Sequence, residues 1–95
     1  MRDVEVIESA EAAAAALDPV RARLLGELAV PASASGLAAR VGITRQKVNY
    51  YLKALEAHGL VKLSEERQHG GITERVLQAS AASYVVSPAP AAPAR

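Results

Sequence analysis

SGLAARVGITRQKVNYYLKALEAHG, residues 35–59, is the stretch that decides the fold of this chain. Its second half has apolar residues at the i, i+3, i+4 and i+7 positions of one helical face, namely Val48, Tyr51, Leu52 and Leu55. Before this helix, Gly42 suits a left-handed helix end and Thr44 suits the N-cap of the next helix. The stretch therefore predicts two helices joined by a turn of about three residues.

The other side of the second helix is polar and rich in hydrogen-bond donors. These donors are Arg45, Gln46, Asn49, Tyr50 and Lys53. Glu56 is the only acid of this helix and lies near its far end. Two helices at this spacing are typical of a helix-turn-helix, whose second helix lies in the DNA major groove. We therefore expect the leucines of this helix to point inward and its donors to face solvent.

Charge is unevenly distributed along the 95 residues. The net charge is +1, yet residues 1–30 carry −3, residues 31–63 carry +4 and the remainder is neutral. A basic middle on a chain that is not basic overall indicates a local patch for a polyanion. The alternative on charge alone is a solvated helix face.

Several other classes of function find no support in the sequence. The chain contains no cysteine, and its two histidines lie far apart, so metal-ligand spacing is absent and we expect no metal or other cofactor. His58 falls in a last helical turn, where the helix dipole favours a cation. No run approaches the roughly 20 apolar residues of a membrane span, no signal peptide is evident, and no catalytic constellation is present. We expect a cytoplasmic, non-enzymatic protein of one small domain.

The N-terminal third predicts an arm and two helices. Residues 1–8 form an extended arm, and Ser9 caps a helix over AEAAAAAL whose small side chains suit either a dimer contact or packing on its own domain. Asp18 and Pro19 start the second helix, which runs to about residue 29. Arg21 and Arg23 lie off its core face, and a structural role and a phosphate contact both remain open.

The remaining elements follow the same local rules. Ser35 is expected to cap the third helix, and the fourth runs over residues 45–58, with Tyr51 in the core and Tyr50 outside. Residues 60–66 and 72–79 alternate as two strands of a hairpin. Its polar tip, residues 67–71, contains two glycines that supply positive φ angles. Residues 81–86 cover the sheet edge or the first helix, and residues 87–95 read as a linker or disordered tail.

Three segments together resemble a known family. The run LDPVRARLLGEL at residues 17–28, then SGLAARVGITRQKVNYYLKALEAHGLV, then a Gly-containing hairpin, is similar to the winged helix-turn-helix repressors of the arsenical-resistance repressor (ArsR) type. The resemblance covers residues 8–86 and implies a mainly α fold with a small β-hairpin, the wing. It also implies a homodimeric transcriptional repressor. The C-terminal helix usual in the family is absent, unless residues 80–84 form a short one.

The expected DNA contacts lie on the second helix of the motif and on the wing. They are Thr44, Arg45, Gln46, Lys47, Asn49, Tyr50, Lys53, Arg67 and His69. Cations neutralise phosphates, whereas Gln46 and Asn49 suit adenine edges and Arg45 suits guanine. Two alternatives stay open, namely a wing tip that contacts nothing and a winged-helix module that binds a protein without nucleic acid. The effector and the operator cannot be read from these residues.

Overall fold

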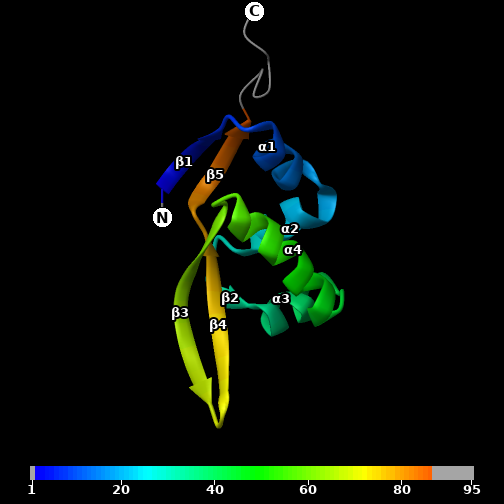
Figure 1. The fold of residues 1–95 in the computed structure, drawn as a ribbon, viewed down its shortest axis with the longest axis vertical. Coiled ribbons are helices and arrows are strands. Elements are labelled where there is room, and N and C mark those ends of the chain that lie inside the picture. The colour runs from blue at the N-terminus through cyan, green and yellow to red at the C-terminus, as the bar shows by residue number, and fades with distance from the viewer. Residues whose placement is uncertain (1, 87–95) are drawn as a thin grey trace, which may run out of the picture.

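The computed structural model describes residues 2–86, which form four helices and five strands. Their order is β1 (Arg2–Ile7), α1 (Ala10–Leu17), α2 (Pro19–Glu27), β2 (Ala32–Ser33), α3 (Ala34–Val41), α4 (Arg45–Ala57), β3 (Val61–His69), β4 (Ile72–Ala79) and β5 (Ala81–Val86). The helices lie together, and the β3–β4 hairpin extends well beyond them (Figure 1). The strands hold only somewhat fewer residues than the helices, so the expectation of a mainly α protein was too strong. The predicted tail, residues 87–95, lies outside the described residues.

Four side-chain caps set the helix starts. Ser9, Asp18 and Thr44 each accept a hydrogen bond from a backbone N–H three residues ahead, as predicted. The predicted cap at Ser35 is wrong, because Ser33 accepts from the Gly36 N–H instead and α3 begins at Ala34. The cause is tertiary: Ser33 is extended and pairs with β4, so the helix can start directly after it.

The core joins all four helices to the base of the hairpin. Its largest fully buried side chains are Leu24, Leu28, Leu37, Val48, Leu55, Leu60 and Val76. The alanines of α1 divide between two environments, because Ala12, Ala13 and Ala15 are buried while Ala14 faces solvent. Their lack of bulk lets α1 lie close to its own domain. None of the helices in residues 2–86 is long and apolar enough to cross a membrane.

The wing is an antiparallel hairpin with a two-residue turn. β3 and β4 pair from Val61↔Ala79 to His69↔Ile72, and β2 adds a short third strand against β4. Arg67, Gln68 and His69 therefore belong to β3, not to the tip as predicted. Of the two glycines in this turn, Gly70 has a positive φ, of 62°, and Gly71 does not, so the prediction for Gly71 was wrong. A tight hairpin turn with Gly at its first central position needs a positive φ only there.

A second, two-stranded sheet closes the opposite end of the molecule. β1 and β5 pair in parallel, with Val6↔Val85 and Ile7↔Val86 in register, so residues 81–84 are strand and not a short helix. Ile7 is buried in the core. The Tyr84 hydroxyl accepts from the Ala81 N–H within β5 and donates to the Leu60 carbonyl, and the second bond joins β5 to the rest of the domain. Burial raises the pKa of Tyr84 above its usual value.

Candidate nucleic-acid interface

Helix α4 has one buried face and one exposed face. Val48, Leu52 and Leu55 are at most 4% exposed and anchor the helix in the core. The predicted contact residues on the other side are all exposed, namely Thr44, Arg45, Gln46, Lys47, Asn49, Tyr50 and Lys53. The expected orientation of this helix is therefore confirmed, and its donors face solvent.

The two adjacent tyrosines separate as expected. Tyr50 is 70% exposed, while Tyr51 is half-buried and packs against the core. Their rings meet edge to face with centroids 5.5 Å apart, and the Arg21 guanidinium lies 5.8 Å from the Tyr51 ring centroid. The Tyr51 ring thus contacts both Arg21 and Tyr50, while most of the Tyr50 side chain stays exposed.

The start of α4 concentrates positive potential. Thr44 Oγ1 accepts from the Lys47 N–H at 3.1 Å, and the first turn contains no acid. Helix N-termini favour anions, and Arg45 and Lys47 lie in this first turn. Within residues 2–86, no ion pair involves Arg45, Lys47 or Lys53. The cations of α4 thus remain available to an external anion.

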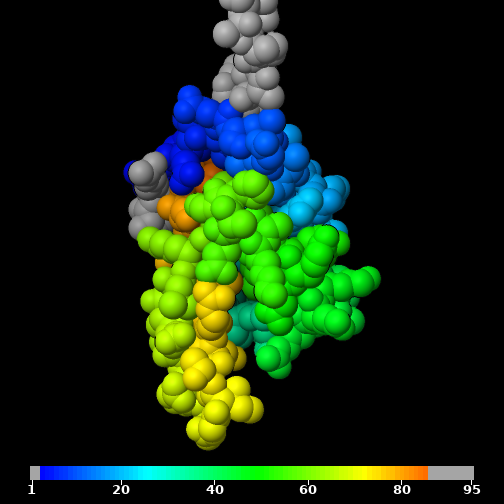
Figure 2. Space-filling model, viewed as in Figure 1, coloured from blue at the N-terminus to red at the C-terminus, as the bar shows by residue number. Residues whose placement is uncertain are grey.

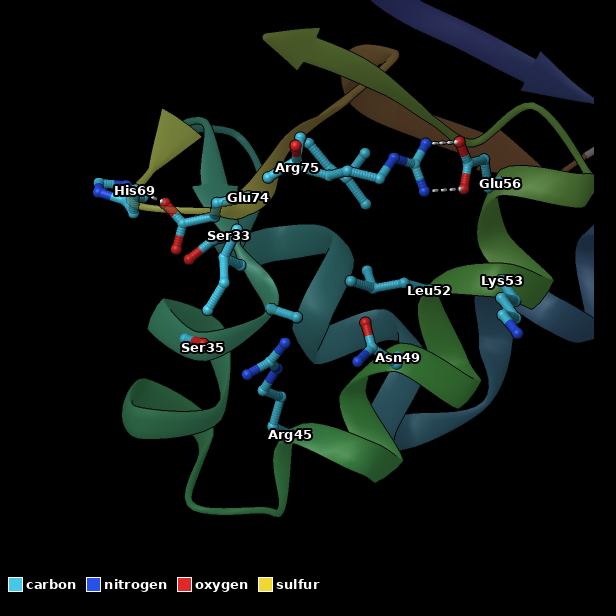
Figure 3. Close-up of a pocket in the computed structure, with 14 residues that line it drawn as sticks. Ser33, Ser35, Arg45, Asn49, Leu52, Lys53, Glu56, His69, Glu74 and Arg75 are labelled. Atoms are coloured by element: carbon cyan, nitrogen blue, oxygen red, sulfur yellow. Dashed lines mark hydrogen bonds and ion pairs between the residues drawn. The ribbon is translucent and has the colours of Figure 1, made fainter. Parts of the chain in front are cut away.

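A groove of about 370 Å³ runs between α4, the start of α3 and the wing. Figure 2 shows the surface hollowed between the hairpin, in yellow, and the green helices. Arg45 and Asn49 rise from α4 into this space, and Ser33 and Ser35 line it from the start of α3 (Figure 3). A guanidinium, an amide and two hydroxyls thus lie among the groups that line this groove beside the exposed helix face.

The outer part of the wing, residues 65–75, holds its basic side chains differently. Arg67 donates to the Glu65 carboxylate at 3.3 and 3.4 Å, and this bond raises the pKa of Arg67. His69 Nε2 lies 3.3 Å from Glu74 Oε1. Both predicted wing residues are therefore exposed, but each already has an acidic neighbour in the hairpin.

Arg21 and Arg23 make contacts within the domain. Arg21 lies 3.8 Å from the Asp18 carboxylate and against Tyr51, and Arg23 reaches the Val41 carbonyl at 3.5 Å. The sequence left open whether these arginines have a structural role or contact phosphates, and the contacts within the domain favour the structural role.

The groove also contains residues that sequence reasoning did not select. Ser33 and Arg75 line it together with Glu56, which had been noted only as an acid on α4. Arg75 donates to the Glu56 carboxylate across 19 residues of sequence, and no local pattern signals such a pair. Within residues 2–86, no group of three His, Cys, Asp or Glu side chains is placed to hold a metal ion.

Comparison with known families agrees with this geometry. A family model described as a helix-turn-helix domain matches residues 16–64, just over half of the chain. An ArsR-like transcriptional regulator from Rhodococcus sp. RHA1 is 37% identical, covers 74% of this chain and superposes with a TM-score of 0.58. The chain belongs to the ArsR-type helix-turn-helix family. It spans 61% of the Rhodococcus chain.

Two further solved structures share the fold of this chain. NolR from Sinorhizobium fredii is 26% identical, with 76% of this chain and 72% of NolR covered and a TM-score of 0.59. A homodimeric winged helix-turn-helix DNA-binding domain from Mycobacterium bovis, a possible ArsR-family regulator, is 24% identical. That match covers 75% of this chain and 62% of the other, with a TM-score of 0.60, and shows the fold alone. A search of curated protein sequences finds no match.

Proposed function

We propose that this ArsR-type chain is a sequence-specific DNA-binding transcriptional regulator that acts as a repressor. The observation that carries the proposal is the exposed side of α4, where Arg45, Lys47 and Lys53 have no acidic partner within residues 2–86. The buried leucines on the other side prevent this face from turning inward. The proposed action is binding alone, without catalysis.

The proposed interface makes two kinds of contact with DNA, one to phosphates and one to base edges. Arg45, Lys47 and Lys53 neutralise phosphates and release counterions, which supplies affinity but no sequence information. Gln46 and Asn49 project from the same face, and each can bond an adenine edge through paired donor and acceptor groups. Tyr50 adds an apolar ring surface for a base or a backbone sugar. Affinity and specificity therefore come from different side chains on one helix.

The chain is proposed to act as a homodimer, because it leaves apolar surface open at the end opposite the wing. Val4, Val6 and Val85 are 53%, 57% and 52% exposed, and Val6 pairs in register with Val85. Parallel sheets are seldom left uncovered on an apolar face. Leu17, at the end of α1, is 66% exposed. A two-fold pairing through α1, β1 and β5 would place the two α4 helices about one DNA turn, or 34 Å, apart.

Selection of duplexes from a random DNA pool, followed by anisotropy titrations at several salt concentrations, tests this function. We expect one enriched, pseudo-palindromic sequence and an affinity that falls as salt rises. Sedimentation velocity should report a dimer, and Val6→Glu should shift it to a monomer. No enrichment and no binding at low salt would contradict the proposal and favour a protein-binding winged helix.

A further inference from the structure

One ion pair joins the wing to α4. Arg75 Nη2 lies 2.6 Å from Glu56 Oε2, and Arg75 Nη1 lies 3.4 Å from Glu56 Oε1, so the guanidinium bonds both carboxylate oxygens (Figure 3). Such two-point pairs restrict orientation as well as distance. The side chains are 50% and 34% exposed, so the pair lies at the surface of the groove and not in the core.

Within residues 2–86, the other hydrogen bonds between the hairpin and the rest of the domain lie near the base of the hairpin. β2 pairs with β4 at Ser33↔Val76 and Ala32↔Leu77, and the Ala79 N–H bonds the Leu28 carbonyl. Beyond Arg75, residues 66–74 bond only within the hairpin, among the contacts that the described residues make. The Glu56–Arg75 pair is thus the side-chain bond nearest the wing tip that reaches the helices.

We propose that Glu56 and Arg75 form a strut that sets the angle of the wing relative to α4, so that both elements meet one DNA duplex in register. Both are positioning residues, and the inference rests on the proposed DNA-binding function. Without the strut, the long two-stranded wing would pivot about the short β2–β4 pairing. The bond also accounts for an acid on a helix face that otherwise attracts phosphates.

The strut and a simple charge effect have opposite consequences for Glu56→Gln. If Glu56 only repels DNA, its neutralisation tightens binding. If Glu56 positions the wing, the same change weakens binding, and we expect a loss of about threefold, the size typical of an exposed ion pair. Glu66→Gln is the matched control, because Glu66 faces Arg75 in the β3–β4 register, is exposed and makes no side-chain hydrogen bond within residues 2–86.

Wing position can be measured without DNA. The chain has no cysteine, so Ala57→Cys and Gly71→Cys place one spin label at the end of α4 and one at the wing tip. A Cβ at Gly71 meets nothing within 4 Å, and Ala57 is exposed. Pulsed electron resonance should give a narrow distance distribution in the parent pair and a broader one with E56Q. The reversed pair, E56R/R75E, should restore the narrow distribution, and circular dichroism checks folding.

The two readouts separate failure of the strut from failure of the proposed function. An unchanged distance distribution in E56Q, or no recovery in E56R/R75E, overturns the strut whether or not the chain binds DNA. If the distances respond as expected but the parent chain binds no duplex, the DNA-binding function fails and the strut survives as a structural link. Tighter DNA binding by both E56Q and E66Q would also overturn the strut, because it would show that Glu56 acts only by repelling DNA, as Glu66 does.

Discussion

Helix α4 and residues 65–75 of the wing both expose basic side chains, yet only those of the wing segment have acidic neighbours within residues 2–86. On α4, Arg45, Lys47 and Lys53 lack ion-pair partners within residues 2–86. On the wing, Arg67 bonds Glu65 and His69 lies beside Glu74. Exposure alone therefore does not make a cation available to DNA. The comparison teaches that α4 should supply the electrostatic attraction, while the wing should contribute through its position.

The largest expected effect comes from reversing charge on α4. R45E/K53E replaces two unpaired cations with acids that face the phosphates, so we expect affinity for the selected duplex to fall by about 100-fold or more. Anisotropy titration at fixed salt measures the change. The matched control is R67E on the wing, for which we expect a much smaller loss. Equal losses of affinity in R45E/K53E and R67E would contradict the claim that α4, and not the wing, supplies the electrostatic attraction.

The next effect concerns base reading. N49A removes an amide that can bond an adenine edge, and a bidentate base contact carries about 1–3 kcal/mol of discrimination. We therefore expect the ratio of affinities for the selected and an unrelated duplex to drop roughly tenfold. Binding to the unrelated duplex should stay nearly constant, because Asn49 has no charge. A uniform loss on both duplexes would instead assign Asn49 to the backbone.

Local sequence rules predicted much of α4 and less of its surroundings. The caps at Ser9, Asp18 and Thr44 and the two faces of α4 follow from short-range patterns, and the structure has them. The choice of Ser33 over Ser35 as a cap depends on pairing with Val76, which lies far along the chain. Local sequence patterns do not indicate which distant residues will pair.

The same limit applies to the candidate interface. Periodicity identified the exposed residues of α4, but not the Glu56–Arg75 pair or the acids beside Arg67 and His69. Glu65 lies two residues from Arg67 and could have been weighed from the sequence, whereas Glu56 and Arg75 lie 19 residues apart. Likewise, the parallel pairing of β1 with β5 joins the two ends of the described chain.

A smaller effect is expected on stability. T44A removes the oxygen that accepts from the Lys47 N–H at the start of α4, and loss of an N-cap costs about 1 kcal/mol. Urea unfolding should show a lower midpoint with an unchanged slope. T44S retains the hydroxyl and should stay close to the parent chain. If T44A and T44S unfold alike, the cap contributes nothing to α4.

The smallest effect is expected for Arg67 on the wing. R67A removes a guanidinium that Glu65 already neutralises, so affinity for the selected duplex should change by less than about twofold. E65Q sharpens the test, because it frees Arg67 and should strengthen binding slightly and steepen its salt dependence. A loss above tenfold in R67A would mean that Arg67 leaves Glu65 for DNA.

The most direct test of the account is the slope of log Kd against log salt for the parent chain, R45A/K53A and R67A/H69A. Each lost phosphate contact lowers this slope by about one. We predict that the slope for R45A/K53A is smaller than the parent slope by about two, while the slope for R67A/H69A stays close to the parent value. A parent slope near zero, or an equal loss in the two variants, would contradict the claim that α4 supplies the attraction to DNA.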